Sequence, residues 1–188
     1  MKTAHWRSHC SADWPKPAVS WLRTRGSLTV RLQRLHGSFR VQLRKQGCGP
    51  VLSDEAALIG VKPGRHARLR QVTLWAGGQP RVVAHTAVKW MGQHSDWPFW
   101  RHLGTRSLGS VLFRDRTVKR GLMQFARLSQ RHPLARQAAG IPHTGVAPRH
   151  WFARRAVYRR ASGLTPLVVT EVFVSVDGLS ATRSDDGM

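Results

Sequence analysis

The chain has 188 residues, of which 31 are Lys or Arg, nine are Asp or Glu and two are Cys. This length is typical of one domain, and a chain of this size buries a sizeable core without disulfide bonds. Cys10 and Cys48 form no metal-ligand or redox spacing, which excludes a zinc ribbon and a thioredoxin-like site. No apolar run approaches the ~20 residues of a membrane helix and no secretory signal is present, so we expect a cytoplasmic protein without a transmembrane segment.

The net charge of +22 is the most prominent feature of the composition. Clustered cations bind nucleic acids by releasing condensed counterions, and a positive field also attracts small anionic substrates. The basic residues are spread along the whole chain without a run of five or six, which favours the second interpretation. We therefore expect no obligatory nucleic-acid partner, although the charge alone does not decide between the two.

The two ends of the chain differ in composition from its centre. Residues 1–17 predict a flexible N-terminal leader and residues 177–188 a disordered C-terminal tail, which leaves residues 18–176 as the domain. Within it, Ser27 is a good N-cap for a short helix that runs to His36.

The next segments predict short elements joined by turns. Apolar and polar residues alternate over 39–44, which predicts a half-buried strand. Residues 46–50, rich in Gly and ending in Pro, predict a turn, and residues 52–60 have the composition of a further helical turn.

The clearest local signal is a β-hairpin. Residues 69–75 and 80–90 are rich in strand-forming residues and are joined by 76–79, a turn by residue type and length. Apolar residues then recur on repeating faces over 108–128, which predicts a helix. Residues 131–150 contain three prolines and two glycines, which indicates a long loop or flap of the kind that is often functional.

A second hairpin closes the domain. Residues 153–160 and 166–175 predict its strands, with a turn at Ser162 and Gly163. Strands that pair through hairpins, with helices grouped between them, are typical of an α+β domain with an antiparallel sheet, here of about six strands.

Glu171 is one of only two glutamates, the other being Glu55. It lies in the most strand-like stretch of the chain, and the two-residue period places it on one face with Val169 and Phe173. Burial on an apolar face favours the neutral carboxyl group, which suits a group that donates or accepts a proton. A water-facing edge position, or a structural partner for one of the arginines, fits the pattern equally well.

Arg70 shares a strand face with Val72 and Leu74. A guanidinium that points inward offers a planar pair of donors to a carboxylate. The alternative is that its long side chain passes its apolar neighbours and places the charge in solvent, which is the more common case.

His85 shares a face with Val83 and Ala87 on the return strand of the first hairpin. A single histidine in an apolar strand is more often a hydrogen-bonded structural residue than a catalyst. The chain contains no Gly-rich phosphate loop, nucleophile elbow or cluster of metal ligands, so its motifs predict no cofactor and no metal.

Several short motifs follow one another with a characteristic spacing over residues 18–175. In order, they are Trp21-Leu22, Gly26-Ser27-Leu28-Thr29, Leu69-Arg70, Ala76-Gly77-Gly78-Gln79-Pro80, Leu103-Gly104, Leu108-Gly109, Leu112-Phe113, Trp151, Arg154-Arg155, Gly163, Pro166-Leu167 and Thr170-Glu171-Val172-Phe173. The ordered set resembles the chorismate pyruvate-lyases, which form 4-hydroxybenzoate at the start of bacterial ubiquinone biosynthesis.

The resemblance implies an antiparallel sheet whose helices and flaps enclose an internal, water-poor pocket. It implies chorismate, a dianion, as substrate, 4-hydroxybenzoate and pyruvate as products, and a carbon–oxygen lyase without a cofactor. By the same resemblance, Arg70 binds the ring carboxylate, Glu171 meets the hydroxyl end of the ring, and Leu28 and Leu108 line the site. Arg70 and Glu171 are thus the expected catalytic residues, and a monomer is the simplest expectation.

His85 is the one departure from the family pattern. It occupies the position at which the family has a second arginine, so we count it among the expected substrate-binding residues. The departure leaves open how the enolpyruvyl carboxylate is held, for which Arg81, Lys89 or a flap arginine are candidates.

Two other functions remain open from the sequence. Ligand-sensing domains of some transcription regulators share the lyase fold without the activity, although they normally follow a DNA-binding domain for which the residues before Ser27 are too few. A basic protein associated with nucleic acid is the third possibility, and it would bind with strong salt dependence.

Overall fold

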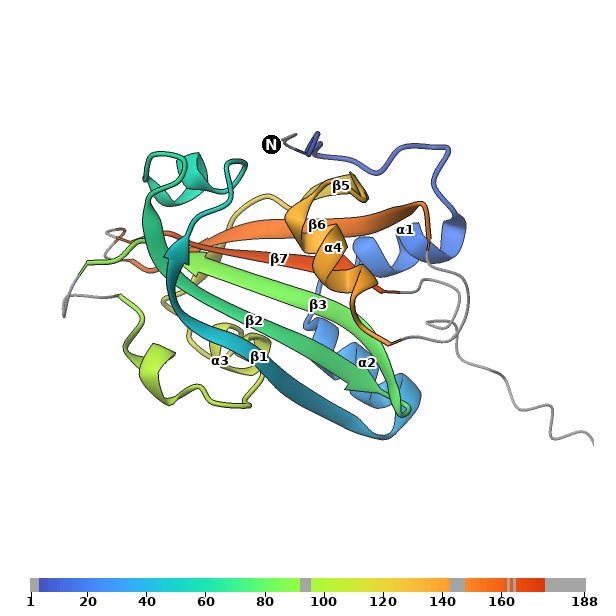
Figure 1. Cartoon of the computed structure of the whole chain (residues 1–188). Helices are drawn as coiled ribbons and strands as arrows, with labels where there is room; N and C mark the ends of the chain where they lie inside the picture. The colour runs from blue at the N-terminus through green and yellow to red at the C-terminus, as the bar shows by residue number, and fades with distance from the viewer. Residues whose placement is uncertain (1–3, 92–95, 143–147, 162, 164, 175–188) are drawn as a thin grey trace, which may run out of the picture.

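The computed structural model describes residues 4–91, 96–142, 148–161, 163 and 165–174, and its centre is one antiparallel sheet (Figure 1). The predicted tail, 177–188, lies outside the described residues. The sheet contains seven strands: β1 (Phe39–Pro50), β2 (His66–Ala76), β3 (Gln79–Val88), β4 (Lys119–Arg120), β5 (Gln124–Ser129), β6 (His150–Arg159) and β7 (Leu167–Phe173). Their order is β1-β2-β3-β7-β6-β4, and β5 also pairs with β6. This confirms the predicted α+β domain.

Helices cover both faces of this sheet. They are α1 (Lys16–Leu22), α2 (Leu28–His36), α3 (Leu108–Leu112) and α4 (Pro133–Ala139), with the 3₁₀ helices η1 (Ala56–Ile59) and η2 (Pro98–His102). The first three lie behind the sheet in Figure 1 and α4 lies in front of it. No helix in the described part of the chain is long and apolar enough to cross a lipid bilayer.

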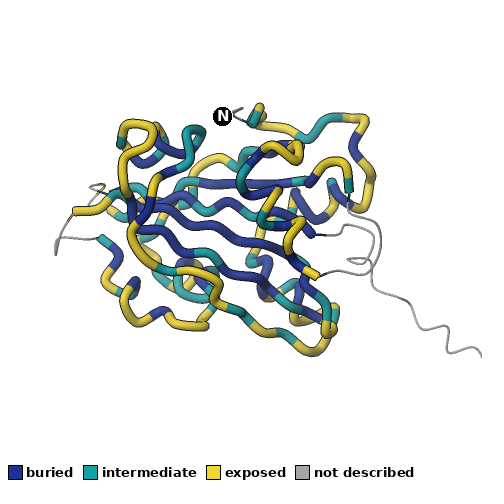
Figure 2. Tube along the Cα trace, viewed as in Figure 1, coloured by how far each residue is buried: buried dark blue, intermediate teal, exposed yellow. Residues whose placement is uncertain are grey.

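The side chains of the central strands alternate between the two faces of the sheet, so each strand contacts both layers of helices. We call the face that carries Arg70, Ala84 and Glu171 the α2 face, because its apolar residues pack with α1 and α2. The opposite face, which carries His85 and Thr170, is the α4 face, because Val83 and its neighbours on that side pack against α4. Figure 2 shows that the middle strands are buried, whereas β1 forms an exposed edge.

The predicted start and end of α2 are confirmed. The Ser27 side chain accepts a hydrogen bond from the backbone N–H of Val30 at 3.4 Å. Gly37 follows the last turn with a φ of 67°, a conformation that glycine adopts without steric strain. The two predicted hairpins are also present as β2–β3 and β6–β7.

Residues 46–50 form the end of β1 rather than the predicted turn. They pair with the beginning of β2, from Gln46 opposite Arg70 to Pro50 opposite His66. Gly and Pro are tolerated there because β1 is an edge strand, where proline need not donate a hydrogen bond to the sheet.

The predicted helix over 108–128 is wrong beyond its first turns. The helix α3 ends at Leu112, and the chain continues as β4 and β5, both of which pair with β6. The spacing of the apolar residues in this stretch fits both a helix and a strand, and pairing with β6 stabilises the strands. The predicted flap over 131–150 contains α4, which starts at Pro133 because proline is favoured in a first helical turn; residues 143–147 of it lie outside the described residues.

Residues 4–15 pack on the domain, whereas the sequence indicated a flexible leader. Arg7 and Phe125 form a β-bridge, and the Trp6 indole donates a hydrogen bond to Asp54 at 2.7 Å. Trp14 is buried in the core beside α1. These contacts depend on segments distant in sequence, which local composition does not reveal.

Candidate active site

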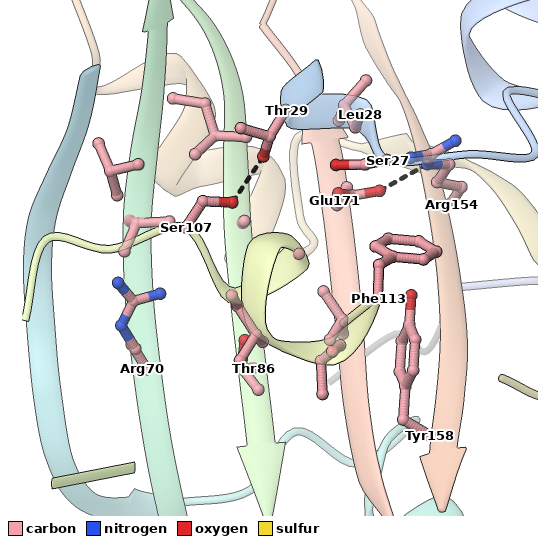
Figure 3. A pocket seen from close by; sticks show the side chains of 18 of the residues that line it. Ser27, Leu28, Thr29, Arg70, Thr86, Ser107, Phe113, Arg154, Tyr158 and Glu171 are labelled. Carbon is pink, nitrogen blue, oxygen red and sulfur yellow. Dashed lines mark hydrogen bonds and ion pairs between the residues drawn. The ribbon is translucent and has the colours of Figure 1, made fainter. Parts of the chain in front are cut away.

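A pocket lies between the α2 face of the sheet and the two helices α2 and α3 (Figure 3). The space between its lining atoms, open solvent at the mouth included, is about 560 Å³. Its walls are mostly apolar, and its polar and charged lining residues are Ser27, Thr29, Arg70, Thr86, Ser107, Arg120, Arg154, Tyr158 and Glu171.

The two helices over the pocket begin with similar sequences. Ser27 and Ser107 are the N-cap residues of α2 and α3, and each is followed by a buried leucine that lines the pocket, Leu28 or Leu108. The Thr29 hydroxyl lies 2.6 Å from the Ser107 hydroxyl, so one hydrogen bond joins the start of α2 to the start of α3. The predicted lining positions Leu28 and Leu108 therefore form an apolar roof over the site.

Arg70 lies on β2 and is 2% exposed. One terminal nitrogen of its guanidinium donates to the backbone carbonyl oxygens of Gly104 and Arg106, both at 2.9 Å. Its Nε is buried and, among the described residues, has no hydrogen-bond partner. Burial lowers the pKa of Arg70 to about 10, so the side chain is still a cation at neutral pH.

Among the described residues, no carboxylate lies within 4.0 Å of the Arg70 guanidinium. A buried charge is costly unless an opposite charge compensates it. The site thus contains a guanidinium that is suited to bind the carboxylate of a ligand.

Glu171 lies on β7 and faces the same pocket, where it forms an ion pair with Arg154 of β6. The Nε of Arg154 lies 2.5 Å from Oε2 of Glu171, and the side chains are 3% and 19% exposed. Arg154 also donates to the backbone carbonyl oxygen of Thr24 at 2.9 Å and contacts those at the end of α1. The pair places a guanidinium directly beside the carboxylate, in contrast to the apolar surroundings expected from the strand pattern.

Tyr158 and Arg120 complete the polar lining on the far side of the pocket from Arg70. They are paired across β6 and β4, so their side chains are neighbours on one face of the sheet. In Figure 3 the hydroxyl end of Tyr158 points toward Phe113 and the Arg154–Glu171 pair. Burial, and then the charge of Glu171, raise the pKa of Tyr158 to about 12 against smaller opposing effects, so the phenol stays protonated at neutral pH.

The charged residues of the lining do not balance. Three arginines, Arg70, Arg120 and Arg154, face the pocket together with one carboxylate, Glu171. Since Arg154 is paired with Glu171, two positive charges remain for a ligand. A small ligand with two negative charges would neutralise them.

The structure places His85 outside this pocket, in contrast to the expectation that it binds substrate. It lies on the α4 face and is 1% exposed, with Nε2 at 3.1 Å from Oε2 of Glu55 and Nδ1 at 3.3 Å from the Gln71 amide nitrogen. The reason is the two-residue period of β3, which sends Ala84 and Thr86 into the pocket and the residue between them to the opposite face.

The four residues that the sequence predicted for one site and that do line this pocket are Arg70, Glu171, Leu28 and Leu108. The polar lining also includes three residues that were not predicted, Arg120, Arg154 and Tyr158. Arg154 was not among the expected site residues, although a signal was available. A hairpin that turns between Ser162 and Gly163 places Arg154 directly opposite Glu171, which is the register of β6 and β7. The position of Arg120 had no such local signal, because the stretch that contains β4 resembled a helix. Tyr158 lies four residues after Arg154 on β6, so the two-residue period places it on the same face.

Comparisons with known proteins agree with this architecture. The family described as chorismate lyase matches residues 1–180. A probable chorismate pyruvate-lyase from Dechloromonas aromatica is 39% identical over 176 residues, which cover 93% of this chain and 96% of the relative. One from Ralstonia nicotianae is 41% identical over 158 residues, 82% of this chain and 79% of the relative.

The fold also occurs in solved structures of low sequence identity. The effector domain of PhnF from Mycobacterium smegmatis is similar with a TM-score of 0.52 at 17% identity, covering 79% of this chain and 88% of that domain. At this identity the likeness concerns the fold alone. The match over residues 1–180 and the relatives at about 40% identity decide the family, and they confirm the prediction of a lyase. The chain belongs to the chorismate lyase family.

Proposed function

We propose that this protein converts chorismate into 4-hydroxybenzoate and pyruvate, and that this step supplies ubiquinone biosynthesis. The observation that carries the proposal is Arg70, a buried cation that shares one pocket with the carboxylate of Glu171 and whose Nε has no hydrogen-bond partner in the described part of the chain. Chorismate is a ring with a carboxylate at one end and a hydroxyl group at the other, and it carries a second carboxylate on its enolpyruvyl group. Its two negative charges match the two positive charges that the pocket leaves uncompensated.

The distance between the two residues suits a six-membered ring. Arg70 and Glu171 lie on β2 and β7, which are separated by β3, and they are offset by two residues, since Arg70 is opposite Thr86 and Glu171 is opposite Ala84. Two strand spacings and this step put their backbones about 12 Å apart. Both side chains line the same pocket. A ring that lies over β3 is then held by its carboxylate at Arg70, with its hydroxyl end toward Glu171.

The reaction requires only the movement of a proton and the loss of a leaving group. The C–H bond at the hydroxyl-bearing carbon supplies the electron pair for a new ring double bond, and the adjacent C–O bond to the enolpyruvyl group breaks. The released electron pair leaves with the oxygen, and a proton converts the enolpyruvate into pyruvate. Because the ring becomes aromatic, the products are strongly favoured.

Glu171 is the group that would accept or relay the ring proton. Arg154 pairs with it and fixes its position through the hydrogen bond at 2.5 Å. The apolar roof formed by Leu28 and Leu108 excludes water, which strengthens the interactions of Arg70 and Glu171 with the substrate.

The direct test is pyruvate formation from chorismate by the purified protein, with 4-hydroxybenzoate measured in parallel. Arg70→Gln should raise the KM for chorismate and weaken binding of 4-hydroxybenzoate, each by about 10- to 100-fold, because it removes a charged carboxylate contact. Lys45→Gln is the matched control, since Lys45 is an exposed cation on the neighbouring edge strand. Absence of pyruvate with the unmodified protein would refute the proposal.

A ligand-binding module without activity is the second candidate, because an effector domain shares the fold. It predicts that 4-hydroxybenzoate or chorismate binds in the pocket while no pyruvate is formed. The same assay, together with a binding titration, separates the two functions.

A further inference from the structure

We infer that Arg120 binds the second carboxylate of the substrate, that of the enolpyruvyl group, and that Tyr158 and Phe113 hold it in place for this role. The inference rests on the proposed function and adds the subsite for the group that leaves. It addresses the question that His85 raised, namely which cation holds this carboxylate.

The other candidates do not face the pocket. His85 is engaged with Glu55 on the α4 face. Arg81 donates to the backbone carbonyl oxygen of Ala76 near the β2–β3 turn, and neither it nor Lys89 lines the site. Of the three arginines that do line it, Arg154 is compensated by Glu171.

Arg120 has the features that a carboxylate-binding group needs. It is partly buried in the pocket wall, and among the described residues no carboxylate lies within 4.0 Å of its guanidinium. It lies across the pocket from Arg70, since β2 and β4 are separated by β3, β7 and β6 in the strand order. Two cations on opposite sides of one pocket match a ligand with two separate carboxylates better than a ligand with one.

The neighbours of Arg120 fix its side chain without neutralising it. Tyr158 lies directly opposite Arg120 across β6 and β4, and the ring of Phe113 lies under the guanidinium at 5.8 Å from Cζ to the centroid. Both contacts favour one position of the guanidinium while leaving its charge available. The Tyr158 phenol is protonated and keeps its own hydrogen to donate to a ligand oxygen.

The subsite can be tested by comparing a ligand with two carboxylates with a ligand that has one. Arg120→Gln should raise the KM for chorismate by about 10- to 100-fold, because a charge-assisted contact is lost, and change the dissociation constant of 4-hydroxybenzoate less than about twofold. Arg70→Gln should weaken both ligands. Tyr158→Phe, which removes only the hydroxyl group, should raise the KM for chorismate by a smaller factor and spare 4-hydroxybenzoate.

The matched control is Lys119→Gln, which removes a positive charge from the same strand at an exposed position. If the effect of Arg120 came only from its contribution to the overall positive field, this variant would raise the KM to the same extent. Retained binding of 4-hydroxybenzoate by Arg120→Gln demonstrates a folded pocket, and Arg120→Lys gives a second variant in which the charge is kept and an intermediate KM is expected.

The possible results separate this inference from the proposed function. An unchanged KM in Arg120→Gln and Arg120→Lys, or equal weakening of chorismate and 4-hydroxybenzoate, overturns the subsite while the lyase activity stands. If the unmodified protein binds 4-hydroxybenzoate but forms no pyruvate, the proposed function fails. In that case a titration with chorismate still decides whether Arg120 recognises the second carboxylate.

Discussion

Each face of the central sheet borders one of the two glutamates, Glu55 before η1 and Glu171 on β7, and the partners of the two carboxylates differ. On the α4 face, Glu55 is 1% exposed and is enclosed by His85 and by the Thr170 hydroxyl, which donates to it at 2.7 Å. On the α2 face, Glu171 is partly exposed to a pocket whose arginines outnumber it. A group whose partners all come from the protein stabilises the fold, whereas an excess of one charge in a pocket favours a ligand of the opposite charge.

A second carboxylate strengthens this difference. Asp54 on the α4 face contacts the Trp6 indole and His132, and Arg155 lies 3.7 Å away. Arg155 and Arg154 are adjacent in sequence, yet β6 sends one to each face. Arg155 therefore belongs to a buried structural network, whereas the adjacent Arg154 lines the pocket.

Replacing each glutamate by glutamine should give the largest difference in turnover number between the two faces. We expect Glu171→Gln to lower the turnover number by about 10²- to 10⁴-fold, because it removes the group proposed to move the ring proton. The measurement is the initial rate of pyruvate release at saturating chorismate. Glu55→Gln is the control and should keep the turnover number per folded molecule within about twofold. Equal turnover numbers for the two variants would contradict the assignment of Glu171.

The same pair of variants should behave differently in unfolding. Glu55→Gln should lower the free energy of unfolding by about 1–3 kcal/mol, since a buried hydrogen-bonding network loses its charge and part of its geometry. Urea denaturation followed by tryptophan fluorescence measures this change. A free energy of unfolding that equals that of the unmodified protein would show that the Glu55–His85–Thr170 contacts are not structural.

Asp54 gives the α4 face a pH dependence. Burial raises its pKa, but hydrogen bonds from His132 and Trp6, together with nearby positive charges, outweigh this and hold the pKa below the ordinary value. Because the folded pKa is lower than the unfolded one, Asp54 contributes stability that is complete above about pH 4 and is lost as the pH falls through the folded value.

The measurement for Asp54 is urea unfolding of the protein and of Asp54→Asn between pH 6 and pH 2.5. The variant should be less stable at pH 6, and the difference between the two proteins should narrow as the pH falls. A difference that stays constant over this range would show that the carboxylate charge does not contribute.

The smallest expected effect concerns the contact between the two helices over the pocket. Thr29→Val removes the hydrogen bond to Ser107, which is worth about 0.5–1.5 kcal/mol, so 4-hydroxybenzoate should dissociate about 2- to 10-fold faster. Stopped-flow displacement measures this rate. Ser107→Ala should have a similar effect, and the double variant should add little, because both changes remove one contact. Additive effects would mean that the two hydroxyl groups act separately.

Much of the site could be predicted because it depends on local periods. The two-residue period of the strands placed Arg70 and Glu171 among inward-facing residues. A turn predicted at Ser162 and Gly163 implies that Glu171 lies opposite Arg154, which is the observed pairing. His85 shows the limit of this reasoning. The period gives its neighbours on the strand, but it does not say which face of the sheet borders the pocket.

The sequence by itself determined the hairpins, the start of α2 and the alternation of side chains, because each depends on residues close together in the chain. Only the tertiary structure decided that β4 and β5 join β6, that Glu55 meets His85, and that Arg120 faces the pocket beside Tyr158. These contacts join residues that are 21 to 40 positions apart in the chain and depend on how the whole sheet packs, so no local pattern contains them. The physical reason is that burial and charge compensation act between neighbours in space, and only the assembled core makes these residues neighbours.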